Sequence, residues 1–126
     1  MAAKILAVDD EPDVLLIVKT GLEMEGYDVL TASDGFQALA RAREDHPDLI
    51  LLDVMMPKMD GFEVLENLKA DEATATIPVI MLTGLSDRTK IQKALVSGIR
   101  WYVVKPFDFD DLLGKVRQAL SSADAS

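Results

Sequence analysis

The chain has 126 residues, of which 49% are hydrophobic and 28% charged, a size and composition typical of one globular domain. It contains no cysteine, which excludes a disulfide framework, a thiolate zinc site and a cysteine nucleophile. The 13 basic and 22 acidic residues give a net charge of -9, which argues against direct binding of DNA or RNA, because such binding depends on basic side chains.

The apolar pattern contains no membrane or export signal. A membrane-spanning helix needs about 20 apolar residues, and the longest apolar runs, such as 49–52 and 79–82, are far shorter. Met1 to Lys4 lead directly into an apolar run without the pattern of a signal peptide. We therefore expect a cytoplasmic location and no membrane contact.

Short apolar runs recur along the chain, with room for a helix between successive runs. Four of the five are rich in Val, Ile or Leu and do not alternate with polar residues, which is typical of strands covered on both faces. The predicted strands, in chain order, are Ile5–Val8, Val29–Ala32, Leu49–Leu52, Val79–Leu82 and Trp101–Val104.

Helix-period patterns follow each predicted strand. Pro12 suits the first turn of the first helix, His46-Pro47 ends the second, and Gly98 ends the fourth. In each of the five predicted helices, a few residues recur at helical spacing and so lie on one face. In chain order they are Val14, Leu15, Val18 and Leu22; Phe36, Leu39 and Arg43; Phe62, Leu65 and Leu68; Ile91, Ala94 and Leu95; and Leu112, Leu113, Val116 and Leu120.

This alternation predicts a doubly wound α/β domain. Parallel neighbours need a connection of helix length, so the five strands form one parallel sheet with helices on both faces. We expect the domain to span residues 1–121. The small, mostly polar residues 122–126 predict a flexible tail or linker.

Reactive side chains directly follow the predicted strands. The first strand is followed by Asp9-Asp10-Glu11, the third by Asp53, the fourth by Thr83 and the fifth by Lys105. In an open parallel sheet, ligands bind at the carboxyl ends of the strands. We therefore expect these acids, the hydroxyl and the lysine to converge on one edge of the sheet.

Such a cluster has a defined electrostatic requirement. Two carboxylates ~4 Å apart repel by about 4 kcal/mol at an effective dielectric near 20, so Asp9, Asp10 and Asp53 need either a raised pKa or a cation. Oxygen ligands favour Mg²⁺, while Lys105 and Thr83 suit an anionic group such as phosphate. These are the components of phosphoryl transfer, with Asp53 as the nucleophile.

At these positions the chain resembles the receiver domain of two-component response regulators, and its size is close to that of single-domain chemotaxis-type regulators. The resemblance covers roughly residues 3–121 and implies a flavodoxin-like (βα)5 fold with strand order 2-1-3-4-5. It rests on four motifs, VDDEP at 8–12, LLDVMMPKMDG at 51–61, MLTG at 81–84 and YVVKPF at 102–107.

The resemblance implies that Asp53 accepts a phosphoryl group from the phosphohistidine of a sensor histidine kinase or a histidine phosphotransfer protein. Asp10, Asp53 and the main-chain carbonyl of Met55 would bind Mg²⁺ directly, and Asp9 would act mainly through water. The protein would catalyse only its own phosphorylation and dephosphorylation and would turn over no metabolite.

The resemblance also implies a switch. Thr83 and Lys105 would contact the phosphoryl oxygens, and Tyr102 would turn inward as Thr83 moves. The surface of helix 4, strand 5 and helix 5 would then change and be read by a downstream partner or output domain. We expect a monomer or weak dimer, and the family pattern favours a cis peptide at Lys105-Pro106.

Some residues depart from the usual family pattern. Gly84 replaces the commoner alanine after Thr83. Arg100 and Trp101 stand where small or acidic residues are usual, which puts in question the dimer formed by regulators with a winged-helix output. Met55 and Leu85, two residues beyond Asp53 and Thr83, are both apolar, and we therefore predict slow dephosphorylation.

Other functions are compatible with parts of the pattern. A receiver-like scaffold without phosphorylation would have no use for the acid cluster. A Mg²⁺-dependent phosphatase of the haloacid-dehalogenase type would place two aspartates two residues apart after the first strand, whereas Asp9 and Asp10 are adjacent. Neither a P-loop nor a glycine-rich dinucleotide motif is present.

Overall fold

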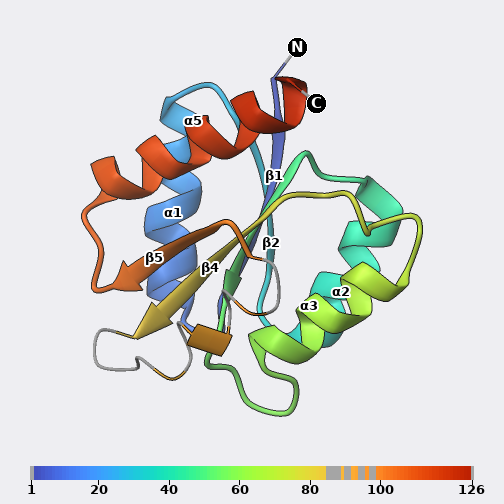
Figure 1. Ribbon diagram of the computed structural model, residues 1–126. Helices are drawn as coiled ribbons and strands as arrows, with labels where there is room; N and C mark the ends of the chain where they lie inside the picture. The colour runs from blue at the N-terminus through green and yellow to red at the C-terminus, as the bar shows by residue number, and fades with distance from the viewer. Residues whose placement is uncertain (1, 85–88, 90–91, 94–95, 97–98, 126) are drawn as a thin grey trace.

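Five parallel β-strands form the central sheet, in the order β2-β1-β3-β4-β5 that the resemblance implies. The computed structural model describes residues 2–84, 89, 92–93, 96 and 99–125 (Figure 1). The strands are β1 (Lys4–Val8), β2 (Asp28–Ala32), β3 (Leu49–Asp53), β4 (Val79–Gly84) and β5 (Trp101–Lys105), so each predicted strand is confirmed with a shift of at most two residues at an end.

Helices cover both faces of this sheet. The helices with both ends in the described part of the chain are α1 (Pro12–Met24), α2 (Gly35–Asp45), α3 (Gly61–Ala70) and α5 (Phe109–Ala125). Figure 1 shows α1 and α5 on one face and α2 and α3 on the other. Strand β3 serves both cores, because Leu49 and Leu51 pack toward α1 and α5 while Ile50 and Leu52 pack toward α2 and α3.

The helix boundaries follow from local chemistry. Pro12 is the first residue of α1, as expected from its fixed φ. The Asp34 side chain caps the start of α2, and His46 ends it in the left-handed conformation with φ 47°. A reciprocal capping box between Asp60 and Glu63 starts α3.

The prediction for the buried face of α2 was wrong at Phe36. This ring is 60% exposed, and the buried positions of α2 are Gly35, Ala38 and Ala42. A Cβ at Gly35 would lie 2.8 Å from the Met59 sulfur. Small residues therefore face the neighbouring segment at close range, and the larger ring turns to solvent.

Helix α5 extends to Ala125, because the Ala, Ser and Asp residues there include no glycine or proline to end it. The flexible tail or linker expected at residues 122–126 stays a prediction. The predicted positions of the fourth helix, Ile91, Ala94, Leu95 and Gly98, lie outside the described residues.

Within the described ranges, no helix combines the length and apolarity needed to cross a membrane.

Candidate functional site

The strand register brings the predicted site residues to one edge of the sheet. Asp9 follows β1 and Asp53 ends β3 at neighbouring positions, because the residues just before them pair with each other. On the other side of β3, Thr83 follows the residue that pairs with Asp53. Lys105 pairs with the residue after Thr83. The predicted convergence of these four side chains is therefore confirmed.

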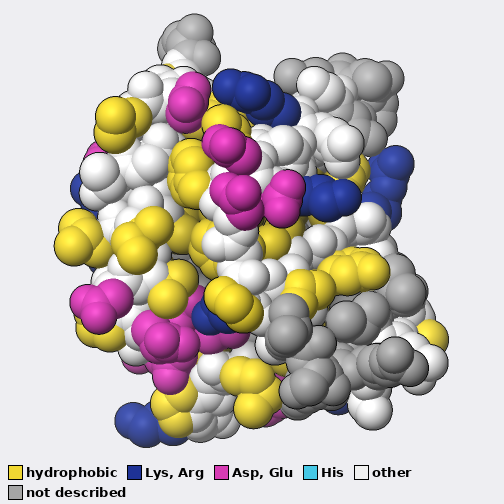
Figure 2. All heavy atoms as spheres, turned by 90° about the vertical axis from the view of Figure 1, so that its left-hand side faces the viewer, with side chains coloured by type: hydrophobic (Ala, Val, Ile, Leu, Met, Phe, Trp, Pro, Cys, Tyr) yellow, Lys and Arg dark blue, Asp and Glu magenta, His cyan; other side chains and the backbone are white. Residues whose placement is uncertain are grey.

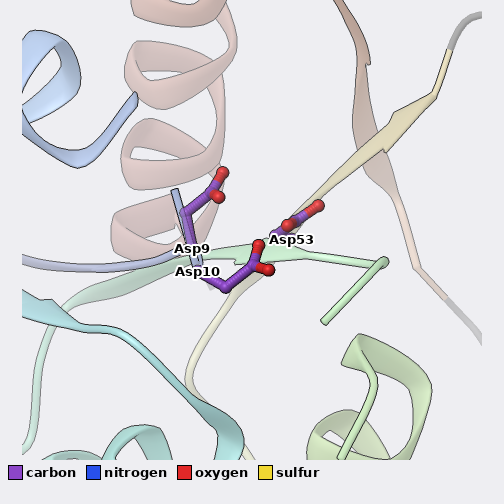
Figure 3. A group of neighbouring side chains, drawn as sticks. All are labelled: Asp9, Asp10 and Asp53. Carbon is purple, nitrogen blue, oxygen red and sulfur yellow. The ribbon is translucent and has the colours of Figure 1, made fainter. Parts of the chain in front are cut away.

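Three carboxylates meet at this edge. Asp9 and Asp53 are buried, with 1% and 3% of their surface exposed, whereas Asp10 is exposed. Figure 3 shows the three side chains around a common space at the ends of β1 and β3. One carboxylate oxygen from each lies within 4.8 Å of the others, a grouping suited to a metal ion.

Lys105 joins these carboxylates from β5. Its Nζ lies 2.7 Å from Asp9 Oδ2 and 3.4 Å from Asp53 Oδ1, so the ammonium pairs with both buried acids. It also lies 3.8 Å from Glu11 Oε1. Figure 2 shows acidic side chains gathered around a small basic patch near the lower edge of the face that α1, β5 and α5 form.

Backbone groups orient the two buried carboxylates. The Glu11 N–H donates to Asp9 Oδ1 at 2.9 Å, which leaves Asp9 Oδ2 for the lysine. The Met55 N–H donates to Asp53 Oδ1 at 3.3 Å. In the described part of the chain, both of these contacts of Asp53 are made by Oδ1.

Asp53 carries the clearest electrostatic perturbation of the site. Burial, followed by the negative charge of Asp9, raises its pKa from 3.8 to about 7. The charge of Lys105 and the Met55 hydrogen bond act in the opposite direction but do not balance them. Burial and the charge of Asp9 therefore outweigh the stabilisation that Lys105 gives to the ionised Asp53 carboxylate.

Asp9 and Asp53 in turn stabilise the charged form of Lys105. Burial by itself lowers the pKa of this ammonium, but the hydrogen bond to Asp9 and the charges of Asp53 and Asp9 together raise it above its usual value. Lys105 is therefore a fixed positive charge beside Asp53 at neutral pH.

Thr83 contributes a buried hydroxyl. The residue is 2% exposed, and its Oγ1 has no hydrogen-bond partner within the described ranges. A buried hydroxyl without a partner is costly. An acceptor oxygen brought within reach of Oγ1, such as one of an anionic ligand, would satisfy it.

The donor set fits a hard divalent cation. Asp9, Asp10 and Asp53 offer only oxygen ligands, and two of these acids are held in place by backbone hydrogen bonds. Mg²⁺ prefers one or two carboxylates together with water and phosphate oxygens. A cation there would also offset the negative charge of Asp9, which after burial is the second cause of the raised pKa of Asp53.

The remaining predicted positions lie on or beside β5. Tyr102 is half-buried, packs against the core beneath α2 and α3, and lines a groove of about 390 Å³ beside α5. Trp101 packs against the opposite core, and the Arg100 guanidinium lies 4.8 Å from its ring. The Lys105-Pro106 peptide is cis, as expected from the resemblance.

Glu11 is the residue whose contact the sequence did not reveal. It was visible as the third acid after the first strand, but nothing in the spacing indicated that its side chain reaches across to Lys105 of β5. The three consecutive acids were the available signal.

Comparison with known proteins identifies this arrangement. Residues 5–117 match the family model described as "Response regulator receiver domain". The chain is 48% identical over 122 residues to the DNA-binding dual master transcriptional regulator RpaA of a Synechocystis strain, covering 96% of this chain and 50% of RpaA. It is 40% identical over 116 residues to the transcriptional regulatory protein KdpE of Mycobacterium tuberculosis, covering 92% of this chain and 50% of KdpE. The chain thus spans about half the length of these curated relatives.

Solved structures agree in fold. The chemotaxis protein CheY4 of Vibrio cholerae superposes with a TM-score of 0.89 at 37% identity, covering 95% of this chain and 100% of CheY4. NtrX of Brucella abortus superposes with a TM-score of 0.91 at 32% identity, covering 99% of this chain and 28% of NtrX.

Proposed function

Because the chain belongs to the response regulator receiver domain family, we propose that Asp53 is its phosphoryl acceptor in two-component signalling. One observation carries the proposal. The Lys105 ammonium lies between the buried carboxylates of Asp9 and Asp53, at the strand edge where the Thr83 hydroxyl has no hydrogen-bond partner among the described residues. A nucleophile, a cation and a hydrogen-bond donor are thus assembled for one anionic group.

In the proposed step, an Asp53 carboxylate oxygen attacks the phosphorus of a phosphohistidine on a sensor histidine kinase or a histidine phosphotransfer protein. A P–O bond forms as the P–N bond breaks, and the bonding electron pair leaves with the imidazole nitrogen. Lys105 pairs with one phosphoryl oxygen, and the Thr83 hydroxyl donates to another. The protein catalyses only the formation and hydrolysis of its own aspartyl phosphate.

Mg²⁺ is the proposed cofactor. Asp10, Asp53 and the Met55 carbonyl would hold it directly, with Asp9 acting through water. When bound, the ion supplies positive charge to the phosphoryl oxygens during transfer. Lys105 supplies a second positive charge beside Asp9 and Asp53, and the backbone donors of Glu11 and Met55 keep the carboxylates oriented.

The proposed output is a change at the surface around β5 and α5, together with the helix predicted between β4 and β5. A phosphoryl group adds nearly two negative charges, which can favour one state of a two-state element. Thr83 would move toward it, and Tyr102, which packs beside the groove at α5, would turn inward. A downstream partner or output domain would read the altered surface.

The names of the relatives suggest the kind of output. RpaA is by name a DNA-binding regulator. By that likeness, phosphorylation here would control a DNA-binding function carried outside these 126 residues, whose net charge of -9 is unsuited to DNA.

Intact mass spectrometry tests the proposed function. Incubation with acetyl phosphate and Mg²⁺ should add one phosphoryl group, and both Asp53→Asn and EDTA should abolish the adduct. Thr20→Val, an exposed hydroxyl on α1, is the matched control and should retain it. No adduct from either acetyl phosphate or a phosphorylated histidine kinase would contradict the proposal and favour an unphosphorylated scaffold.

A further inference from the structure

Glu11 occupies the N-cap of α1 but does not cap the helix. Its side chain makes no capping hydrogen bond to the described residues of α1, and its backbone N–H donates to Asp9 Oδ1. Ser, Thr, Asp or Asn would be the usual choice at this position, because their short side chains reach the free N–H groups of the first turn. The Glu11 carboxylate instead lies 3.8 Å from the Lys105 ammonium.

Lys105 is therefore shared by three carboxylates with different surroundings. Asp9 and Asp53 hold it at 2.7 and 3.4 Å from the buried side, and their side chains are 2% and 4% exposed. Glu11 approaches from the solvent side with a side chain that is 64% exposed. An ammonium has three N–H donors, so it can serve all three acids.

The three acids also differ in whether they belong to the group of carboxylates that could hold a metal ion. In the described part of the chain, the carboxylates grouped within 4.8 Å of one another are Asp9, Asp10 and Asp53. A cation there offsets the charges of Asp9 and Asp53 and weakens their attraction for Lys105. Glu11 lies outside that group and retains its full attraction.

We propose that Glu11 is a positioning residue that holds Lys105 on the solvent side of Asp53 for the incoming phosphoryl group. The inference rests on the proposed function. Glu11 should then affect the limiting rate and the apparent donor affinity in different ways. It orients the lysine, but it also adds a negative charge that repels an anionic donor. Loss of its charge should lower the limiting rate of phosphorylation without weakening the apparent affinity for the donor.

The test measures the rate of Asp53 phosphorylation over a range of acetyl phosphate concentrations at saturating Mg²⁺. Glu11→Gln should lower the limiting rate about two- to fivefold, the effect expected of an exposed ion pair, with an unchanged or lower half-saturating donor concentration. Glu11→Asp keeps the charge but has a shorter side chain, and its limiting rate should fall between those of the wild type and Glu11→Gln. Asp13→Asn removes an equal charge from the first turn of α1 and should leave the limiting rate unchanged.

A double-mutant cycle tests whether Glu11 acts through Lys105. In a Lys105→Ala background, Glu11→Gln should have no further effect on the remaining rate. An equal reduction in both backgrounds, an unchanged limiting rate in Glu11→Gln, or the same loss in Asp13→Asn would overturn the inference. If the wild-type protein is not phosphorylated at all, the proposed function fails and the role of Glu11 fails with it. If the wild-type protein is phosphorylated but one of the outcomes above occurs, only the role of Glu11 fails, so the two failures are distinguishable.

Discussion

Gly61, the first residue of α3, lies directly against the backbone of Asp53. A Cβ at Gly61 would stand 2.5 Å from the Asp53 carbonyl oxygen and 2.8 Å from Val54 Cα. Both are backbone atoms and cannot turn aside as a flexible side chain can. The Gly61 N–H also donates to the Val54 carbonyl at 2.9 Å, which fixes the start of α3 to the end of β3.

Gly61→Ala should therefore displace Asp53 and destabilise the fold. We expect the free energy of unfolding to fall by about 1–3 kcal/mol, the usual cost of overpacking, and phosphorylation to slow. Gly114→Ala is the control, because no atom of the described residues lies within 4 Å of a Cβ at that position in α5. It should stabilise the protein by up to about 1 kcal/mol. Urea unfolding gives both values, and a neutral Gly61→Ala would show that the two backbones are not in close contact.

Lys58 is a second position where the backbone favours glycine. Its φ of 71° is in the left-handed region, which is costly for a residue with a Cβ. Lys58→Gly should raise the free energy of unfolding by about 0.5–1 kcal/mol, after allowing for the greater freedom of glycine in the unfolded chain. Lys58→Ala keeps the Cβ and should give no such gain. Equal effects of the two substitutions would rule out backbone strain as the cause.

The pH dependence of stability should reveal the perturbed carboxyl of Asp53 in metal-free protein. Its pKa is raised from 3.8 to about 7, so the folded state binds this proton more tightly than the unfolded state. The contribution of this proton to the free energy of unfolding is fully present below pH 3.8 and is lost as pH rises through about 7.

Asp53→Asn removes this titration. In EDTA, the variant should gain stability relative to wild type between about pH 4 and about pH 8, by on the order of a few kcal/mol. Urea unfolding of both proteins at several pH values measures the difference. A difference that does not change with pH would contradict the raised pKa.

Met55 should control the lifetime of the phosphoryl group. Its side chain is 57% exposed, two residues beyond Asp53, and as a thioether it is a poor partner for an attacking water. A polar Met55→Asn side chain can orient water, so hydrolysis should become severalfold faster. Met24→Asn changes a methionine that is 83% exposed at the end of α1 and should leave the lifetime unchanged. Leu85, the other apolar position predicted to slow hydrolysis, lies outside the described residues.

Much of the fold could be predicted because buried parallel strands have an unmistakable composition. The run Leu49–Leu52 is apolar at every position, as a strand that feeds two cores must be. The prediction failed at Phe36 because helix periodicity identifies a repeating face but not its distance from the neighbouring segment. Gly35 sets that distance through its close approach to Met59.

The composition of the site was predictable, but its internal partnerships were not. The carboxyl ends of the strands in a parallel sheet lie at one edge, so the sequence alone predicts that Asp53 and Lys105 lie near each other. That Lys105 lies closer to Asp9 than to Asp53, and also reaches Glu11, depends on side-chain geometry between elements 96 residues apart in sequence. No local pattern contains that information.

Locating the phosphoryl group by chemistry would be the most direct test of the proposed acceptor. Borohydride reduction converts an aspartyl phosphate into homoserine, which peptide mapping identifies by its mass. After treatment with acetyl phosphate and Mg²⁺, homoserine should appear at position 53 alone. Homoserine at Asp9 or Asp10 instead, or none in a protein that carries the phosphoryl adduct, would contradict the role assigned to Asp53.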